Sequence, residues 1–397
     1  MDGSACPCSP RALAPIAIPR RLRPYRPTMP HSRTKIDIPH RVPLVIVGAG
    51  VVGLWCAVKA VRRGLAPLVL DAGAAGGGAS NGHLGALMPH QPFNWSAKKQ
   101  AQLEGLLALE TEVAELEGRT GLSCGYRRSG RIVPLTTEAQ RERHAQWAQA
   151  AAKRWPGVSP GGQALAWRIL DANPAPGWIA EEAAPFGFAM ETLSARLAPR
   201  RLTAALKAAL AGRAVVAGNQ AVNRIDPDGT VHLADGRTVL GGRVILSAGW
   251  RSSALLAGDP SMPPVTGVKG QSALLEPERP LDPAMPLLFD DGVYAIVHED
   301  GLVAVGSTSE KQWSDPASTD DRLDAVIERA RALSPALRTA RVVERWAGIR
   351  PRGPTAAPVT GRLGESRIVA ATAGFKITFA IAHDMAACAL AEALAMP

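Results

Sequence analysis

The chain has 397 residues, 46% of them hydrophobic and 20% charged, which allows two domain-sized cores and is ordinary for a globular protein. The formal net charge of +10 is concentrated at the start, where residues 1–40 hold seven Lys and Arg side chains against two Asp. The rest of the chain has no dense basic run and few aromatic residues to stack on bases, which argues against a nucleic-acid-binding protein.

Residues 1–40 are predicted to form a disordered tail. They contain eight prolines and scattered arginines without apolar periodicity. An Arg-rich start also suits an organelle transit peptide, but the prolines oppose the amphipathic helix that such a peptide needs. We favour a third interpretation, in which translation begins at Met29.

The five cysteines form neither a Cys-x-x-Cys pair nor a set at zinc spacing, which indicates reduced thiols in the cytoplasm and no metal site. Cys56 and Cys388 fall in predicted helices and are expected to be small core residues. The most apolar stretch, residues 44–61, is interrupted by three glycines and Lys59, so we expect no transmembrane segment.

A dinucleotide site is predicted where the first periodic elements begin. Residues 42–47 have the apolar, β-branched composition of a buried parallel strand, and residues 54–63 have a helical pattern. Between them the chain reads Gly48-Ala49-Gly50-Val51-Val52-Gly53, and a second apolar run at 67–70 ends in Asp71. Strand, glycines, helix, strand and acid in this order are typical of a dinucleotide-binding fold.

Each part of this motif has a physical task. Gly48 permits the tight turn, Gly50 lets the backbone approach a pyrophosphate, and Gly53 lets helix and strand pack closely. The amides of the first helical turn and the helix dipole hold the phosphates. Asp71 is expected to accept hydrogen bonds from the ribose hydroxyls.

The segment after Asp71 resembles one particular family. Gly76-Gly77-Gly78-Ala79-Ser80-Asn81-Gly82-His83-Leu84 is similar to the segment that follows the ribose-binding acid in the D-amino-acid-oxidase superfamily, which includes glycine oxidase, sarcosine oxidase and D-amino-acid dehydrogenase. In that superfamily the segment runs along the flavin. In this chain the acid is Asp where Glu is commoner, and the stretch from Ser to Asn is shorter.

Further matches follow in the family's order along nearly the whole chain after residue 42. They are the helix entry 197–202, the strand 215–222, the turn 244–252, the strand start 264–271, the hairpin 293–308, the strand 346–351 and the helix start 374–376. The resemblance implies that the cofactor is FAD, because return strands so late in the chain fit FAD held extended across an N-terminal dinucleotide fold.

The resemblance also implies which residues contact FAD. These are Gly48, Gly50, Val51, Val52, Gly53, Asp71, Ala79, Ser80, Asn81, Gly82, Val222, Ala248, Gly249, Trp250, Gly348, Gly374, Phe375 and Lys376. We expect the flavin to be non-covalent, since no cysteine follows residues 346–351 closely, where monomeric sarcosine oxidases attach theirs.

Substrate contacts are implied at further matched positions. Arg350 matches the arginine that grips the substrate carboxylate in glycine and D-amino-acid oxidases, and its planar fork suits that task. Tyr294 matches the hairpin tyrosine that assists it, and Lys376 matches a lysine near the carboxylate in sarcosine oxidases. His83 and His90 lie on the segment expected beside the flavin, where each either contacts substrate or flavin or is a hydrogen-bonded loop residue.

The predicted fold is of the α/β class: a Rossmann-like FAD-binding domain of the glutathione-reductase type with a second, α+β substrate domain on a mostly antiparallel sheet. The FAD-binding domain is expected to comprise residues 42–120, 197–262 and 337–397, and the substrate domain residues 121–196 and 263–336. Helices are predicted at 101–117, where apolar residues recur at helical spacing, and at 138–155.

The leading functional prediction is FAD-dependent oxidation of the C–N bond of a small amino acid or amine. One alternative is 2-hydroxy-acid dehydrogenation, which needs a base such as His83, His90 or His298. Another is a flavoprotein subunit of a hetero-oligomeric amine or opine dehydrogenase. The expected partner is a small-molecule substrate, with a homo-oligomer or a flavoprotein partner subunit as further possibilities, and the expected location is the cytoplasm.

Overall fold

The structure is a computed structural model that describes residues 37–256, 258–355 and 357–396. Most of the tail predicted for residues 1–40, including Met29 and the first two cysteines, therefore lies outside the described residues. From Ile38 onward the chain forms one unit, and two eight-stranded sheets organise it.

The first sheet carries the glycine turn. Its strands are β1 (Arg41–Val47), β2 (Leu68–Leu70), β8 (Val215–Ala217), β9 (Val222–Ile225), β10 (Thr230–Leu233), β11 (Thr238–Leu246), β17 (Val359–Arg362) and β18 (Ile368–Thr372). The strands β18, β11, β1, β2 and β8 lie in that order and are parallel, while β17, β10 and β9 join by antiparallel pairs. The predicted first strand and its late return strand are thus confirmed, because β1 pairs in parallel with both β2 and β11.

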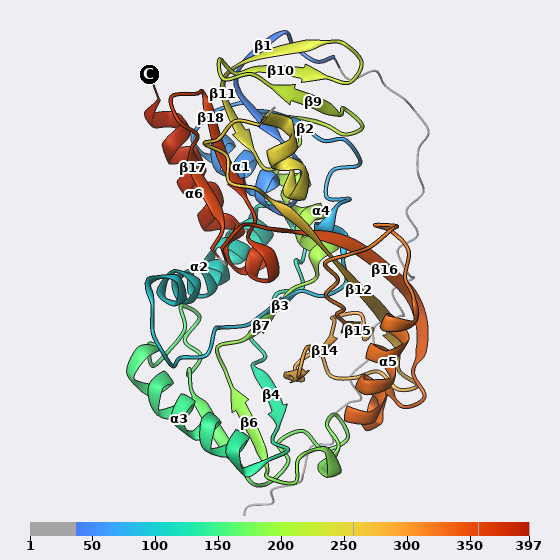
Figure 1. Cartoon of the computed structure of the whole chain (residues 1–397). Helices are drawn as coiled ribbons and strands as arrows, with labels where there is room; N and C mark the ends of the chain where they lie inside the picture. Colours follow the sequence, from blue (N-terminus) through green and yellow to red (C-terminus); the bar gives the residue numbers. More distant parts are fainter. Residues whose placement is uncertain (1–36, 257, 356, 397) are drawn as a thin grey trace, which may run out of the picture. The chain divides into compact units, whose positions relative to one another are not determined.

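Four helices pack against one another beside this sheet (Figure 1). They are α1 (Val51–Arg62), α2 (Ala97–Thr120), α4 (Pro199–Leu210) and α6 (Thr378–Ala395). Helix α2 is longer at both ends than the predicted 101–117. Its first turn is capped by Ser96, whose Oγ accepts a hydrogen bond from the Lys99 amide, and it ends at Gly121 in the left-handed conformation with φ of 68°.

Helix α6 is a core helix with one exposed side. Among the described residues, the stretch Phe375–Ala395 is the one helix long and apolar enough to cross a membrane, and half of it is buried. It packs on α1 and α2 and runs beside β17 and β18 (Figure 1). Cys388 lies on the exposed side, so the core role predicted for it is wrong, whereas Cys56 in α1 is fully buried as expected.

The second sheet is antiparallel at every pair except β4 with β13, which confirms the predicted mostly antiparallel sheet. Its order is β16-β12-β15-β14-β13-β4-β6-β5. The bounds are β4 (Arg131–Pro134), β5 (Trp167–Leu170), β6 (Phe188–Glu191), β12 (Thr266–Glu276), β13 (Leu287–Asp290), β14 (Val293–Val297), β15 (Val303–Gly306) and β16 (Arg341–Arg352). Strand β16 was placed by the predicted boundaries in the FAD-binding domain, yet its hydrogen bonds join it to β12 of this second sheet.

Two helices that pack on the second sheet and one small ribbon complete the described fold. Helix α3 (Glu138–Arg154), predicted at 138–155, packs on β5, and α5 (Asp321–Leu333) packs on β14 and β15 (Figure 1). The two-stranded ribbon pairs β3 (Ala86–Leu87) with β7 (Ala195–Arg196). It ties the segment after the glycine-rich stretch to the chain that leads into α4.

The register of the second sheet decides which side chains share a face. Ser272 lies opposite Trp346 on one side and opposite Gly306 on the other, and Gly306 lies opposite Tyr294. Arg350 is four residues beyond Trp346 on the same strand, so its side chain points to the same side. We call this side, with Trp346, Ser272, Gly306, Tyr294 and Arg350, the inner face.

The strand predicted at 215–222 is interrupted. Strand β8 ends at Ala217, and the chain turns through Gly218 and Asn219, whose φ is 56°, before β9 begins at Val222. The amides of Asn219 and Gln220 donate to the carbonyls of Gly73 and Asp71, at 2.9 and 2.7 Å. The turn thus lies beside the end of β2. A strand that continued without interruption from 215 to 222 would carry the chain away from this position.

Candidate active site

The glycines of the turn after β1 have the packing that the motif predicts. Gly48 has φ of +105°, and a Cβ there would collide with the Ser247 backbone of the return strand. A Cβ on Gly53 would collide with the Gly48 carbonyl, so only glycine lets α1 approach the strand. A Cβ on Gly50 would meet only Ser80 Oγ, at 3.4 Å. Gly50 is therefore the position at which a ligand can approach the turn.

The start of α1 leaves donors that suit a phosphate group. The Val51 amide donates to Ser80 Oγ at 2.9 Å, and the first turn holds no acidic side chain. Within the described part of the chain, the amides of Val52 and Gly53 have no acceptor. Free amides at the positive end of a helix attract anions, so this turn fits the pyrophosphate of FAD.

Asp71 holds the turn together. Its carboxylate accepts hydrogen bonds from the Ala49 amide at 2.6 Å and from the Gly73 amide at 2.8 Å. A carboxylate has about four lone-pair sites, so these two bonds leave capacity for ribose hydroxyls. Val222 begins β9 just after the turn beside Asp71, which is consistent with the FAD contact predicted for it.

The glycine-rich segment runs from this turn to the inner face. Its residues Ala79–Asn81 form a short 3-10 helix, and the Asn81 carbonyl accepts a hydrogen bond from Arg200 Nε at 2.9 Å. A Cβ on Gly82 would lie 2.9 Å from the Trp346 ring, and Gly348 is also covered by that ring. Of the residues predicted to contact the flavin, Gly82 and Gly348 are therefore brought together by Trp346.

The return turn after β11 closes on the first turn. Ser247 Oγ donates to the Gly48 carbonyl at 3.0 Å, and Thr372 Oγ1 donates to the Gly249 carbonyl at 3.1 Å. Ala248 and Gly249 are thereby placed next to the glycine motif. The predicted contacts Gly374, Phe375 and Lys376 follow β18 directly, in the turn before α6.

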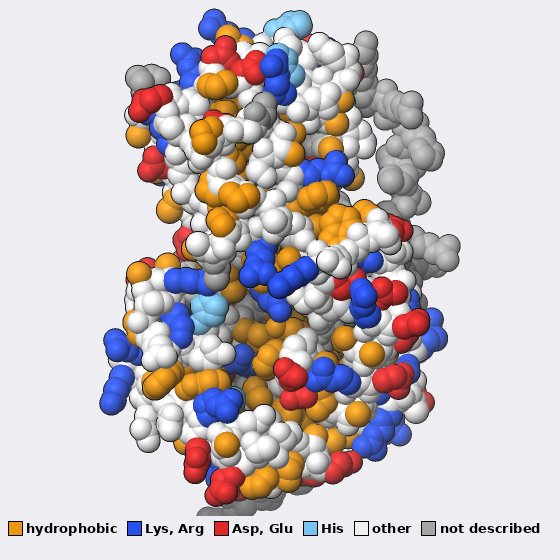
Figure 2. Space-filling view, in the orientation of Figure 1, with side chains coloured by type: hydrophobic (Ala, Val, Ile, Leu, Met, Phe, Trp, Pro, Cys, Tyr) orange, Lys and Arg blue, Asp and Glu red, His pale blue; other side chains and the backbone are white. Residues whose placement is uncertain are grey.

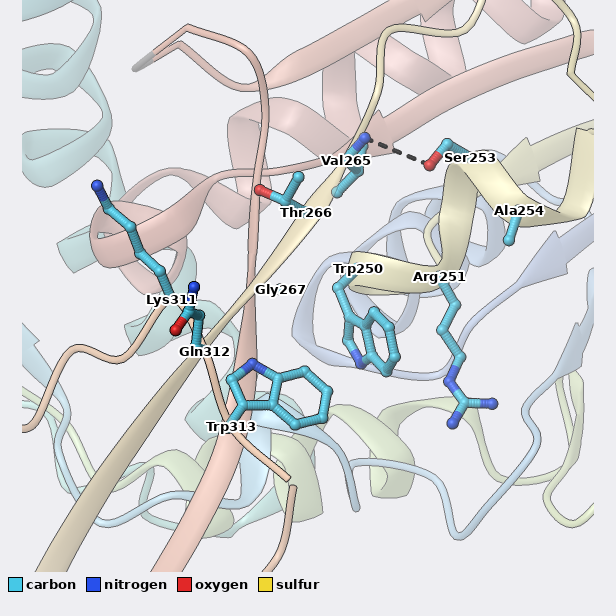
Figure 3. Close-up of a pocket in the computed structure, with 10 residues that line it drawn as sticks. All are labelled: Trp250, Arg251, Ser253, Ala254, Val265, Thr266, Gly267, Lys311, Gln312 and Trp313. Atoms are coloured by element: carbon cyan, nitrogen blue, oxygen red, sulfur yellow. Dashed lines mark hydrogen bonds between the residues drawn. The ribbon is translucent and has the colours of Figure 1, made fainter. Parts of the chain in front are cut away.

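Trp250 lies in a different place from the other predicted FAD contacts. It lines a cavity of about 560 Å³ with Arg251, Gly267, Lys311 and Trp313 (Figure 3). The two indole rings meet edge to face with centroids 5.6 Å apart. Gly267 is one residue from Val268, which lies opposite Arg350, so this cavity is on the side of β12 that faces away from Arg350.

Arg350 is a half-buried cation with no anionic partner in the described chain. Its guanidinium donates to Ser307 Oγ at 3.2 Å and to the Thr308 carbonyl at 2.5 Å, and it lies over the Phe375 ring at 6.0 Å. Its Nε has no acceptor, and no described carboxylate lies within 4.0 Å of it. Burial lowers its pKa from the ordinary value, as expected for a cation removed from water, and the charge of Glu310 opposes this only in part.

Tyr294 and Lys376 flank Arg350. Burial raises the pKa of Tyr294, while the charges of Arg131 and Arg350 act in the opposite direction. Lys376 is exposed, with its Nζ 6.0 Å from the centre of the Phe375 ring, over which Arg350 also lies. The structure thus gathers Arg350, Tyr294, Phe375 and Lys376 into one group. Figure 2 shows Lys and Arg side chains gathered near the middle of one face, above a group of hydrophobic side chains.

His83 is enclosed in a polar network that no sequence pattern predicts. Its Nδ1 lies 3.1 Å from Ser272 Oγ, and its Nε2 lies 3.3 Å from Arg200 and 3.4 Å from Glu344. Arg200 in turn binds Glu344 through two hydrogen bonds, at 2.9 and 2.6 Å. Arg200 stands in the matched segment 197–202, but only the structure shows that its side chain crosses to β16.

This environment keeps the His83 ring neutral. Burial and then the charge of Arg200 lower its pKa to about 4. An unfolded histidine titrates near pH 6.5, so between pH 6.5 and 4 the unfolded chain binds more protons than the folded chain. The free energy of unfolding therefore falls as the pH drops through this range.

The variant His83→Gln should lack this pH dependence. When the pH is lowered from 7 to 5, we expect its free energy of unfolding to fall by about 2 kcal/mol less than that of the wild-type protein. Urea unfolding at both pH values measures this, and equal losses in the two proteins would contradict a neutral buried ring.

The other two histidines considered as bases, His298 and His90, have different environments. His298 is buried, its Nε2 lies 3.0 Å from the His83 carbonyl, and burial lowers its pKa. His90 is half-buried, its Nε2 has no partner in the described chain, and its backbone amide donates to Gln102 at 2.8 Å. Burial, and then Lys98 and Lys99, lower the pKa of His90.

Comparison with known proteins identifies the family. A family model described as DAO, FAD dependent oxidoreductase, matches residues 43–388. The chain belongs to this family. It is therefore a FAD-dependent oxidoreductase, and the glycine turn with its free amides fits that cofactor.

Individual relatives agree with the family. The chain is 29% identical over 334 residues to a glycine oxidase of Pseudomonas putida, covering 80% of this chain and 85% of the relative. It is 26% identical over 350 residues to a glycine oxidase of Geobacillus kaustophilus, covering 84% and 88%. The crystal structure of glycine oxidase from Geobacillus kaustophilus has the same fold, with a TM-score of 0.79 at 22% identity over 90% of this chain and 96% of that one.

Proposed function

We propose that this FAD-dependent oxidoreductase oxidises the C–N bond of a small amino acid or a related amine. Relatives that span most of the chain are named glycine oxidase, which supports an amine-bearing substrate with a carboxylate. The single observation that carries the proposal is Arg350, a half-buried guanidinium without an anionic partner in the described chain, on the inner face beside Tyr294.

Arg350 and Tyr294 are proposed to bind the substrate carboxylate. The arginine fork offers two parallel donors, and its neighbours Ser307 and the Thr308 carbonyl fix the orientation of the guanidinium. The phenol of Tyr294 keeps its proton because burial raises its pKa. Its O–H can therefore donate a further hydrogen bond to the substrate carboxylate. Together they fix the carboxylate and hence the position of Cα.

The cofactor-facing residues would hold FAD by its phosphates and backbone contacts. The amides of Val52 and Gly53 and the open side of Gly50 are the groups that fit the pyrophosphate. When bound, FAD supplies the oxidant that accepts a hydride from the substrate Cα. The substrate amine loses a proton to solvent, the C–N single bond becomes an imine, and water hydrolyses the imine to an oxo acid and ammonia or an amine.

Oxidation of a 2-hydroxy acid is less well supported. That reaction needs a base for the alcohol proton, and the proposed bases were His83, His90 and His298. Both ring nitrogens of His83 have polar neighbours, and His298 faces the His83 backbone, so His90, whose Nε2 has no partner in the described chain, is the base left for this alternative. A partner subunit, a homo-oligomer and a cytoplasmic location remain predictions.

Matched amino and hydroxy acids test the proposal. We expect glycine or N-methylglycine to bleach the flavin of the purified protein under anaerobic conditions, and glycolate to leave it oxidised. Stopped-flow absorbance of the flavin measures both. Bleaching by glycolate together with inertness toward the amines would replace the proposal with the hydroxy-acid alternative.

A further inference from the structure

A second arginine lies on the inner face of the second sheet. Tyr294 lies opposite Phe289 on β13, and Leu287, two residues earlier on that strand, lies opposite Arg131 on β4. Residues two apart on a strand, and residues opposite each other on neighbouring strands, share a face. Arg131 therefore points to the same side of the sheet as Tyr294 and Arg350.

The Arg131 side chain is buried but not enclosed by oxygen acceptors. Its guanidinium lies 5.2 Å from the Trp167 ring centre and 5.7 Å from that of Phe289. One terminal nitrogen lies 3.6 Å from Met88 Sδ, a weak acceptor. In the described chain no oxygen accepts a hydrogen bond from either terminal nitrogen.

The nearest anion, Glu191, forms an ion pair with Arg131 but approaches only its Nε. Its Oε1 lies 3.0 Å from Arg131 Nε, but the geometry is not that of a hydrogen bond. The same carboxylate accepts hydrogen bonds from the amides of Leu193 and Ser194, both at 2.9 Å, and from Ser194 Oγ. One terminal nitrogen of Arg131 thus has only the Met88 sulfur as an acceptor, and the other has none in the described chain, so both remain available to an anion.

The side chains between the two arginines are half-buried. Met88, Phe289 and Tyr294 each keep some exposure, so the surface beside Arg131 is open. The charges of Arg131 and Arg350 both act on the Tyr294 phenol. One tyrosine hydroxyl thus lies in the field of two guanidinium groups, an arrangement that suits a ligand with two anionic ends.

We propose that Arg131 binds a second carboxylate of the substrate, so the enzyme prefers small amino acids with two acidic groups. This inference rests on the proposed function, in which Arg350 holds the first carboxylate. The second carboxylate is carried either on the amine nitrogen, as in iminodiacetate, or on the side chain, as in aspartate. Both present the same anion to Arg131.

The wild-type protein tests this with a matched pair of compounds. Iminodiacetate and its monoamide, N-(carbamoylmethyl)glycine, have the same size and differ in one charge. We expect anaerobic flavin reduction per unit concentration to be on the order of 10–100-fold faster with iminodiacetate. The enantiomers of aspartate, each compared with asparagine, show whether a side-chain carboxylate is used as well. Equal rates for every charged and uncharged pair would overturn the inference.

Variants test whether Arg131 is responsible for the preference for iminodiacetate over its monoamide. Arg131→Met combined with Glu191→Gln removes both charges together, so neither is left buried alone. We expect this double variant to reduce the ratio between iminodiacetate and its monoamide to about one. Arg168→Met is the matched control, because Arg168 is an exposed cation on β5 that points to the other side of the sheet from Trp167. It should keep the wild-type ratio, and a ratio unchanged in the folded double variant would exclude Arg131.

Binding without turnover separates this inference from the proposed function. Thiodiacetate and methylthioacetate lack an oxidisable C–N bond and differ in the second carboxylate. Calorimetric titration of the FAD-loaded protein should show tighter binding of thiodiacetate by on the order of tenfold or more. If no amine bleaches the flavin but thiodiacetate still binds more tightly, the proposed function is refuted and the second carboxylate site is not. Bleaching by glycine with no preference for thiodiacetate would refute only the second carboxylate site.

Discussion

Replacing Arg350 with Ala is expected to lower the rate constant for flavin reduction per unit concentration of amino acid by about 10²–10³. The guanidinium is half-buried, without an anionic partner in the described chain, and fixed by Ser307 and the Thr308 carbonyl. Removing one partner of a buried charged pair typically costs about 2–5 kcal/mol, partly because the other charge is left unpaired. Anaerobic stopped-flow reduction of the flavin measures the loss.

Two controls separate carboxylate binding from general damage. Arg350→Lys should recover only part of the rate, because an ammonium keeps the charge and loses the planar fork. A decarboxylated amine, methylamine in place of glycine, should be nearly indifferent to either change. Turnover of glycine by Arg350→Ala at the wild-type rate would refute the assignment and move attention to Lys376, which shares the Phe375 ring.

Replacing Gly50 with Val is expected to abolish FAD binding while the chain still folds. A Cβ at this position meets only Ser80 Oγ at 3.4 Å, so the protein itself has room for a side chain. The pyrophosphate would need the same space above the free amides of Val52 and Gly53. FAD released by acid from the purified variant, measured by its absorbance per mole of protein, should fall to the background.

Gly118→Val is the matched control for the Gly50 variant. Gly118 lies in α2, and a Cβ there meets no atom within 4 Å, so the same enlargement is made far from the turn. It should retain the native FAD content, and both variants should keep the native far-ultraviolet circular dichroism. A Gly50→Val protein that purifies with a full complement of FAD would show that the pyrophosphate does not lie over this turn.

The parts of the fold that follow from backbone geometry were predictable from the sequence. Gly48 and Gly53 each stand where a side chain would collide with backbone, so their spacing alone specifies the turn and the helix that follows it. The late return strand and the hairpin β14–β15 were implied by the family resemblance and are confirmed by the pairings.

The parts that depend on side chains meeting across the fold were not predictable. The network of His83, Ser272, Arg200 and Glu344 joins segments up to 261 residues apart in the sequence, and no local pattern marks it. The role proposed for Arg131 was equally hidden, because it depends on the register of four strand pairs that join five strands. Cys388 was misplaced because an apolar helix pattern does not say which side of α6 is exposed.

The most direct test of C–N oxidation is the product of a single anaerobic turnover. The FAD-loaded protein is mixed with excess glycine without oxygen, and the reduced flavin, glyoxylate and ammonia are then quantified in the same sample. The account predicts that the three are formed in equal amounts, because each substrate loses one hydride to the flavin and its imine is hydrolysed. Reduced flavin without ammonia, or no reduction with glycine, N-methylglycine or iminodiacetate, would contradict it.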